Sequence, residues 1–599
     1  VLATLLRDHT TGKNIFWATH DYEAFGSEYD YHSEIQPELF TGEHGMVISP
    51  RVLKSKESQT DRVKDMAEVF TPSWVVKKMV DYVDLNINTL CLEITCGEAP
   101  FLVSRYDTTT GEPIAINERI GILDRKLRMV NVRQLSNEEW IAQVRQAFQS
   151  TYGYEWQGDS LLLARKNLLY TFIEHYEARY NRTPDVTLLK EFAEIISWNL
   201  WQMDGLTYQI PRDKSEEQPQ AQLSLFNEAP TEALPPLCII MDWQKGKTIK
   251  VNDIKKRQTK NIDIMKFDVI IGNPPYQEET ESDSTRKPPI FNFFMDEAYK
   301  CADKVMLITP ARFLFKAGYT SKAWDEKMLN DTHLKVVYYE PISDNIFRNT
   351  DIKGGVAITY RDEKNNLGPI GTFTKFPLLN DILKRVMAKN PISIQKIFSV
   401  PLSYSLSEVM ITENPHLLDR LRTSAFSKLS DVFYDIRPSD CHDYIKMIGL
   451  EGKERVKKYV RKDYIRDNSG TLYKWKVLLP EASGTGQLGE TLGKSMIAEP
   501  GEAFTQTFIC IGKADNKNEA LNIEKYVKTK FVRAMIGVLK VTQHTHKGTW
   551  KYVPLQDFTS SSDIDWSKSI AEIDEQLFDK YGLDEPERNF IRTKVKEMA

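Results

Sequence analysis

The stretch of sequence that decides the fold reads Phe267-Asp268-Val269-Ile270-Ile271-Gly272-Asn273-Pro274-Pro275-Tyr276. Its first six residues are a short, mostly apolar run that ends in glycine, and such a run predicts a buried strand. The last four residues follow without a gap, so they should lie at the carboxyl end of this strand. Ligands of open α/β sheets bind at that edge. The stretch therefore predicts a buried strand with a ligand site at its end.

The four residues after the strand offer hydrogen-bond acceptors beside an aromatic ring. Pro274 and Pro275 have no N–H and a fixed φ, so the backbone there presents carbonyl groups only. Asn273 adds a side-chain carbonyl, and Tyr276 adds a flat aromatic face. Acceptors next to a stacking ring suit a planar base that carries an exocyclic amine. A plain turn would also explain two adjacent prolines, so the remaining sequence has to decide.

Predicted strands and helices alternate on both sides of this stretch. Thr71-Pro72 reads as the start of a helix over 73–83, and the turn 95–100 should lead from a strand into a helix beginning at Phe101. Strands alternating with helices predict an α/β fold with a doubly wound, mostly parallel sheet. The other predicted strands cover 89–94, 150–155, 195–201 and 305–310, and the other helices cover 161–172 and 291–302.

The bulk composition limits the class of protein. The chain has 599 residues, of which 41% are hydrophobic and 27% charged, so two to four globular domains are expected. The formal net charge of −5 means that any contact with nucleic acid must come from a local patch. Six scattered cysteines without a CxxC pair argue against a zinc site and fit a reducing cytoplasm. No apolar run approaches the ~20 residues of a membrane span, so we expect a cytoplasmic protein without metal or membrane contact.

Two acidic residues follow successive predicted strands. Glu155 ends the 150–155 strand, where an acid suits ribose hydroxyls. Asp204 follows the next strand, where a carboxylate can accept a hydrogen bond from an adenine amine. Each acid alone reads more simply as a surface charge or a helix cap. Their joint position, with the small-residue turn of 93–102 ahead of them, predicts a nucleotide-like cofactor.

The order of these motifs is similar to that of the S-adenosylmethionine-dependent adenine-N6 DNA methyltransferases. It starts at Phe70-Thr71-Pro72, continues through 93–102, Glu155 and Asp204, and ends at Asn-Pro-Pro-Tyr. Cofactor motifs ahead of Asn-Pro-Pro-Tyr resemble the gamma class of these enzymes, which includes the TaqI-like and Eco57I-like restriction-modification methylases. The resemblance implies a Rossmann-like methyltransferase sheet. It covers 61–365 well, 366–599 only by position and the N-terminal 60 residues hardly at all.

The resemblance assigns roles to individual residues. Ile94 and Ala99 depart from the family's glycine- and proline-containing turn, and the Ala99 methyl group would be tolerated if φ is negative. Gly205 stands where the family often has Phe. The residues implied to bind S-adenosylmethionine are Thr71, Pro72, Glu93, Thr95, Cys96, Gly97, Phe101, Glu155, Asp204 and Phe294. Asn273, Pro274, Pro275 and Tyr276 are implied to be catalytic, and Phe347 to hold the far side of the target base; core packing explains both Phe residues equally simply.

The implied reaction is a direct methyl transfer to an adenine that has left the DNA stack. Asn273 Oδ1 and the Pro274 carbonyl would accept hydrogen bonds from the amine and aim its lone pair at the methyl group. Positioning and electrostatics would supply most of the rate, so neither a covalent nucleophile nor a metal is needed.

The sequence divides into three regions. We expect an N-terminal extension over 1–60, a methyltransferase domain over 61–365 with a flexible insertion at 212–236, and an α+β target-recognition domain over 366–599. Double-stranded DNA is the implied partner. A basic run interleaved with Tyr459 and Tyr464 suits phosphate contact, although a solvated helix face explains it too. This run comprises Lys453, Arg455, Lys457, Lys458, Arg461, Lys462 and Arg466.

Two further partners and two rival functions stay open. Gln222-Leu223-Ser224-Leu225-Phe226 looks like the pentapeptide that docks bacterial proteins on the replication sliding clamp, or its apolar residues fold onto the protein's own core. No nuclease motif is recognisable, so cleavage in a restriction-modification or related defence system would come from a separate subunit. Protein-glutamine methyltransferases share Asn-Pro-Pro-Tyr. A methyltransferase fold that only binds DNA, without turnover, is the other rival.

Overall fold

The computed structural model places most of the chain. The structure describes residues 1–40, 48–50, 52, 71–211, 236–255, 265–277, 288–316, 319–348, 350–399, 403–420, 425–452, 454–540 and 544–598. These residues form two compact units, Val1–Gly371 and Thr372–Ala599. Among them, no helix combines the length and apolar character needed to cross a bilayer. The described side chains also bring no three His, Cys, Asp or Glu residues together as a metal site would require.

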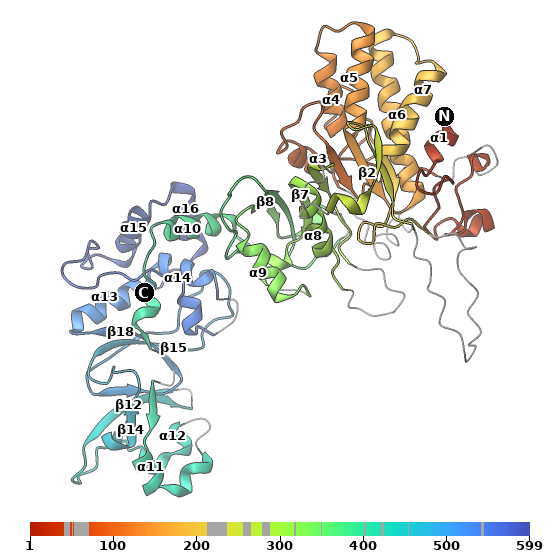
Figure 1. The fold of residues 1–599 in the computed structure, drawn as a ribbon. Coiled ribbons are helices and arrows are strands. Elements are labelled where there is room, and N and C mark those ends of the chain that lie inside the picture. The colour runs from red at the N-terminus through yellow and green to blue at the C-terminus, as the bar shows by residue number, and fades with distance from the viewer. Residues whose placement is uncertain are drawn as a thin grey trace, which may run out of the picture. The chain divides into compact units, whose positions relative to one another are not determined.

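The first unit is built on one seven-stranded sheet (Figure 1). Its strand order is β3-β2-β1-β6-β7-β9-β8, and all neighbours are parallel except that β9 runs antiparallel to β7 and β8. This architecture confirms the predicted α/β fold with a mostly parallel sheet. The strands are β1 (Cys91–Ile94), β2 (Thr151–Glu155), β3 (Leu200–Gln202), β6 (Phe267–Gly272), β7 (Ala302–Pro310), β8 (Leu334–Glu340) and β9 (Val356–Asp362).

Strand β6 lies between β1 and β7, at the point where the strand order reverses. Ile94 of β1 is in register with Gly272 of β6, and Glu93 with Gly153 of β2. The carboxyl ends of β1, β2 and β6 therefore meet at one edge. In open α/β sheets such a switch point is where ligands bind.

Long helices cover this sheet and pack on one another through aromatic rings. Phe172 and Phe192 stack with centroids 3.8 Å apart, and Phe148 meets both rings edge-on. These rings join three neighbouring helices into one layer (Figure 1). The helices of the unit are α3 (Ser73–Val80), α4 (Ile122–Asn131), α5 (Asn137–Gln149), α6 (Gly158–Tyr180), α7 (Val186–Asn199), α8 (Phe291–Cys301) and α9 (Lys322–Asn330).

Two predicted elements are wrong. The strand expected over 195–201 is largely helix, because α7 continues to Asn199 and only β3 is extended. The helix expected at Phe101 does not form. The Glu93 carboxylate accepts the N–H groups of Phe101 and Leu102, and the carbonyl groups of the same two residues accept from the first turn of α4. Turn geometry therefore persists until α4 begins at Ile122.

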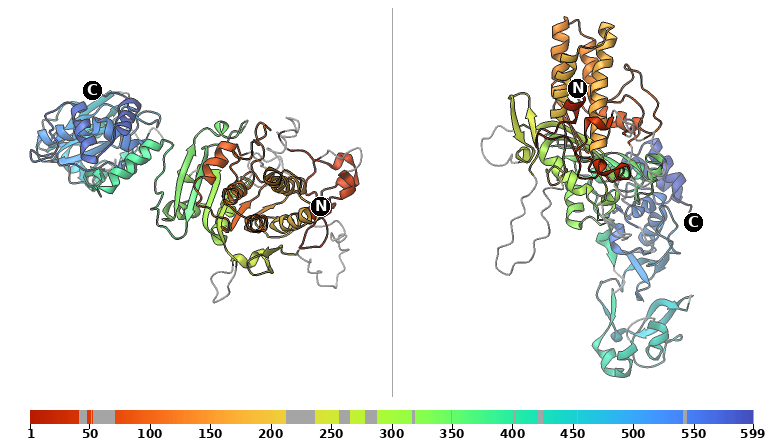
Figure 2. Two further views of the ribbon diagram at one scale, coloured as in Figure 1. Left: turned by 90° about the horizontal axis from the view of Figure 1, so that it is seen from above. Right: turned by 90° about the vertical axis from the view of Figure 1, so that its right-hand side faces the viewer.

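The N-terminal 40 residues are an integral part of the first unit. Helix α1 (Leu2–Leu6) lies beside α6 and α7 (Figure 2). Leu6 and Trp17 are buried as deeply as the core of the sheet. Three short 3-10 turns follow at Glu23–Phe25, Ser27–Tyr29 and Pro37–Phe40.

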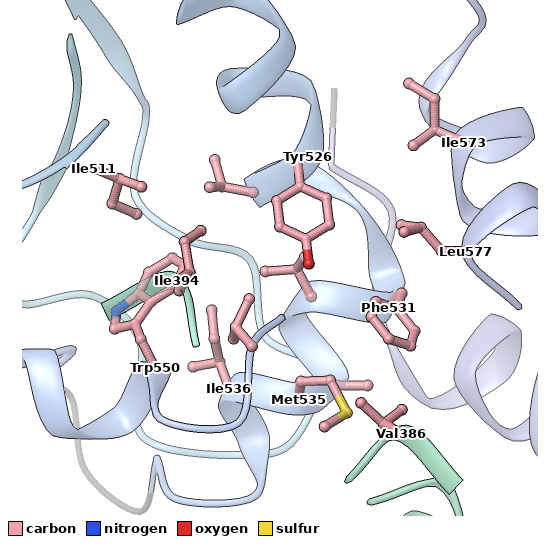
Figure 3. Close-up of a cluster of buried hydrophobic side chains, with 14 of the residues drawn as sticks. Val386, Ile394, Ile511, Tyr526, Phe531, Met535, Ile536, Trp550, Ile573 and Leu577 are labelled. Carbon is pink, nitrogen blue, oxygen red and sulfur yellow. The ribbon is translucent and has the colours of Figure 1, made fainter. Parts of the chain in front are cut away.

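The second unit mixes helices with small sheets, which confirms the expected α+β character of this part. Its main core gathers Tyr526, Phe531, Met535 and Trp550 beneath the helices (Figure 3). The sheets are ordered β10-β18-β15-β16, β13-β12-β17 and β11-β14. The longer elements are α10 (Pro377–Ala388), β12 (Tyr444–Glu451), β13 (Glu454–Arg461), β15 (Trp475–Pro480), β18 (Phe508–Ala514), α13 (Lys517–Lys528), α14 (Lys530–Gly537), α15 (Ile570–Tyr581) and α16 (Glu585–Lys594).

Candidate active site

Three sequence motifs meet at the carboxyl end of β6. The Asn273 side-chain amide donates to Thr71 Oγ1 at 3.2 Å. The Thr95 hydroxyl lies within hydrogen-bond distance of the Asn273 carbonyl, also at 3.2 Å, and of the Ile94 carbonyl. Thr71 is buried, and Pro72 after it precedes α3. The structure therefore brings Asn273 together with residues from the helix start and from the turn after β1.

Glu155 connects the ends of β1 and β2. Its Oε2 accepts the Gly97 N–H at 2.8 Å, and its Oε1 accepts the N–H groups of Trp156 and Gln157 at 2.9 and 3.2 Å. Burial raises the pKa of Glu155, while the three N–H donors oppose that rise. Burial likewise raises the pKa of Glu93, which holds the Phe101 end of the same turn. Through these hydrogen bonds, Glu155 and Glu93 hold the backbone of the turn that follows β1.

The turn after β1 is conformationally unusual. Thr95, Gly97 and Ala99 all have positive φ, at 44°, 52° and 62°. The condition under which the Ala99 methyl group would be tolerated, a negative φ, is not met. Ala99 occupies a left-handed position that costs an L residue roughly 1–2 kcal/mol. Cys96, between these residues, is buried, and its N–H donates to the Tyr154 carbonyl. Strained residues of this kind cluster at functional sites.

Asp204 and Gly205 lie beyond the end of β3. Asp204 Oδ1 caps its own turn by accepting the Leu206 and Thr207 N–H groups at 2.7 and 2.8 Å. A Cβ atom at Gly205 would lie 2.5 Å from a Phe294 ring carbon and 2.6 Å from the Tyr154 hydroxyl. These two rings therefore occupy the space that a side chain at 205 would need.

Tyr276 and Phe347 face each other across the end of the motif. Both rings are buried, and their centroids are 6.4 Å apart with an interplanar angle of 59°. The Tyr276 hydroxyl has no hydrogen-bond partner among the described residues, and burial raises the pKa of Tyr276. A base stacked between parallel rings needs about 7 Å, from roughly 3.4 Å per stacking step. The two tilted rings therefore do not form a parallel sandwich of that spacing.

The basic run of the second unit lies on strands rather than on a helix. Its residues from 454 to 461 form β13, which pairs antiparallel with β12. Lys457 pairs with Glu502, Lys458 with Glu451 and Asp435, and Arg461 with Glu413 and Asp463. Arg455 lies over the Phe508 ring and Lys462 over the Tyr473 ring. Arg466 is exposed on β14 (Ile465–Asp467), and Lys453 lies outside the described residues.

The clamp-like pentapeptide Gln222–Phe226 and the insertion around it lie outside the described residues.

Tyr154 packs over Gly205 and was not identified from the sequence as a site residue. In the sequence, the glycine at 205 could have indicated this, because a position without a side chain leaves room for a ring from another residue beside Phe294.

Part of the chain is similar in sequence to known proteins. Residues 149–347 match the family model described as the Eco57I restriction-modification methylase. An uncharacterized adenine-specific methylase of Mycoplasma pneumoniae is 33% identical over 100 residues, which are 16% of this chain. This chain spans about a quarter of that relative, 24% of its length.

The solved structures that this chain matches include two restriction-modification enzymes. One is the type IIL enzyme MmeI in complex with DNA, at 11% identity and a TM-score of 0.27, over 94% of this chain and 78% of that one. The other is a nuclease-deletion mutant of the type ISP enzyme LlaGI in complex with a DNA substrate mimic, at 13% identity and a TM-score of 0.34. That match covers 89% of this chain and 52% of the LlaGI chain. The segment that matches the Eco57I restriction-modification methylase model contains β2, β6 and the Asn-Pro-Pro-Tyr motif.

Proposed function

We propose that this chain transfers the methyl group of S-adenosylmethionine to the exocyclic N6 amine of an adenine in double-stranded DNA, within a restriction-modification or related defence system. The observation that carries the proposal is the position of Asn273. It directly follows the central strand of the sheet and is hydrogen-bonded to both Thr71 and Thr95. An acceptor side chain fixed beside the cofactor-type turn is what positioning an amine for transfer requires.

The residues present fit S-adenosylmethionine by their chemistry. Glu155 offers carboxylate oxygens to ribose hydroxyls at the end of β2, and Asp204 offers an oxygen to the adenine amine at the end of β3. The Gly97 turn has no side chain that would block close approach, and a Cβ there would meet open space. Phe294 supplies a ring for the adenine face. When bound, the cofactor supplies an electrophilic methyl group.

The target base would be gripped by the Asn-Pro-Pro-Tyr segment. Asn273 Oδ1 and the Pro274 carbonyl accept hydrogen bonds from the amine, which draws its lone pair out of the ring and toward the methyl group. Extruding the base costs a few kcal/mol, and stacking on Tyr276 offsets about 1–3 kcal/mol of it. Phe347, whose ring centroid lies 6.4 Å from that of Tyr276, would hold the far side of the base.

Target recognition is assigned to the second unit. DNA phosphates would contact the exposed cations near β13 and β14, and a separate restriction subunit would carry out any cleavage.

The clamp-like pentapeptide is tested on its own with a peptide spanning 216–230. Absence of binding to the sliding clamp at ~100 μM would remove that partner.

The most direct test is methylation-sensitive sequencing of DNA from cells that express this chain. We expect N6-methyladenine in one recurring sequence context, and none in cells expressing Asn273→Ala. Sequencing that shows no modified adenine in any context, from cells with soluble protein, would refute the proposal.

The shared Asn-Pro-Pro-Tyr motif calls for two further comparisons. Incubation with labelled cofactor and either duplex DNA or a release factor separates DNA methylation from glutamine methylation. Calorimetry with S-adenosylmethionine separates an active enzyme from a DNA-binding module, because a module with a dead site gives no saturable heat.

A further inference from the structure

The turn that follows Glu155 is held by the N-terminal segment of the chain. Gln202, at the end of β3, forms a reciprocal pair with the Phe16 backbone. Its Oε1 accepts the Phe16 N–H and its Nε2 donates to the Phe16 carbonyl, both at 2.8 Å. The same Nε2 donates to the Trp156 carbonyl at 2.7 Å. One buried amide therefore ties residue 16 to the turn directly after Glu155.

A second contact closes the turn from the same side. The Gly158 N–H donates to the Trp17 carbonyl at 2.9 Å. A Cβ atom at Gly158 would lie 1.9 Å from the Phe16 carbonyl oxygen, so only glycine allows the two backbones to approach this closely. Trp17 is itself fixed, because it is buried and its indole donates to the Glu28 carbonyl at 3.0 Å.

Side chains from the same segment reach the residues on either side of this contact. The Tyr22 hydroxyl donates to Asp159 Oδ2 at 2.8 Å, in the first turn of α6. The Trp156 indole donates to the Tyr31 hydroxyl at 3.0 Å. Trp156, Gly158 and Asp159 are therefore all contacted by residues 16–31, hereafter the N-terminal brace.

The brace acts on Glu155 through the turn. Two of the three N–H groups that orient the Glu155 carboxylate belong to Trp156 and Gln157, within the braced turn. The third belongs to Gly97 across the site. Displacing the turn would therefore rotate the carboxylate away from Gly97 and from the cofactor's place.

We propose that the N-terminal brace is a positioning element for cofactor binding, and that Gln202 and Tyr22 are positioning residues that act through Glu155. The inference rests on the proposed function, because it takes Glu155 as the group that contacts the cofactor ribose. It assigns the segment before the methyltransferase motifs a part in cofactor affinity, beyond stabilising the fold.

A double-mutant cycle on the full chain tests this inference. S-adenosylmethionine affinity is measured by calorimetry for wild type, Gln202→Met, Glu155→Gln and the double variant. We expect Gln202→Met to weaken binding tenfold or more, and the double variant to bind no more weakly than Glu155→Gln alone, because both changes remove the same contact. Multiplying effects, or wild-type affinity in Gln202→Met, would overturn the inference.

Two more variants keep the test independent of folding. Tyr22→Phe removes one hydroxyl and keeps the ring, so it replaces Gln202→Met in the cycle if that variant does not fold. Ser150→Ala is the matched control: it lies before the amino end of β2 and loses buried bonds to Lys126 and the Ile87 carbonyl. We expect it to lower the melting temperature with affinity within twofold of wild type. A comparable affinity loss in Ser150→Ala would reduce the brace to general stabilisation, whereas a wild-type chain without saturable binding would refute the cofactor proposal itself.

Discussion

Replacing Asn273 by alanine should separate catalysis from cofactor binding. The change removes one of two proposed acceptors for the target amine and leaves the other, the Pro274 carbonyl. Loss of one preorganised hydrogen-bonding group at a reacting centre typically costs 10²–10³ in rate, about 3–4 kcal/mol. We therefore expect kcat to fall at least a hundredfold.

The structure also limits the other effects of this substitution. The Asn273 side chain bonds to Thr71 at 3.2 Å, and losing that partly buried bond costs about 1 kcal/mol of stability. Its carbonyl, which is paired with Thr95, is unchanged by the substitution. The turn at Gly97 and Glu155 is untouched, so cofactor affinity should stay within about fivefold, from the same ~1 kcal/mol scale.

The assay is transfer of a labelled methyl group to duplex DNA, with cofactor affinity measured separately by calorimetry. Thr71→Val is the matched control, because it removes the partner of the Asn273 amide and keeps the acceptor. We expect that variant to lose roughly tenfold in kcat, the equivalent of one hydrogen bond of about 1.4 kcal/mol. Full activity in Asn273→Ala, or a larger loss in Thr71→Val than in Asn273→Ala, would refute the role given to Asn273.

Three further outcomes follow from the structure. Gly205→Ala should destabilise the first unit by about 1–3 kcal/mol in urea unfolding, because its Cβ would lie 2.5 Å from Phe294. Burial lowers the pKa of Lys126 to about 8, so between pH 8 and its unfolded value the unfolded chain binds more protons and stability rises with pH. Urea unfolding should therefore show wild type gaining about 2 kcal/mol over Lys126→Met from pH 8 to pH 10. If the second unit binds DNA, Arg466→Ala should reduce the slope of log affinity against log salt by about 1, whereas Lys458→Ala, already paired with acids, should change it less.

Local pattern was sufficient for the elements whose signals lie close together in sequence. The apolar run of β6 and the helix α8 lie where the sequence placed them. The motifs at 71, 95 and 273 were expected at one sheet edge, and their hydrogen bonds place them there. Parallel strands end at the same edge, so strand order along the chain was enough.

Distant contacts decided the features that the sequence did not predict. The N–H groups of Ile122 and Leu123 take the carbonyl groups of Phe101 and Leu102, which a helix at 101 would need for its own hydrogen bonds, and no local signal in the sequence indicates these bonds. Ile195 and Ile196 are buried in the last turns of α7, although their β-branched side chains favoured a strand. The acids that pair with the basic run include Glu451 of β12, Glu502 of β17 (Glu502–Phe504) and Glu413 of α11 (Glu408–Glu413). The number of basic residues in the sequence therefore overstated how many cations are available to bind DNA.

The position of β6 in the middle of the sheet has a consequence for synthesis on the ribosome. Strand β1 ends at residue 94, but the strand that pairs with its other side begins only at residue 267. At about 5–20 residues per second, the nascent chain presents an open β1 edge for roughly 9–35 s. Translation speed and chaperone occupancy during that interval should therefore govern how much of the newly made protein reaches its native state.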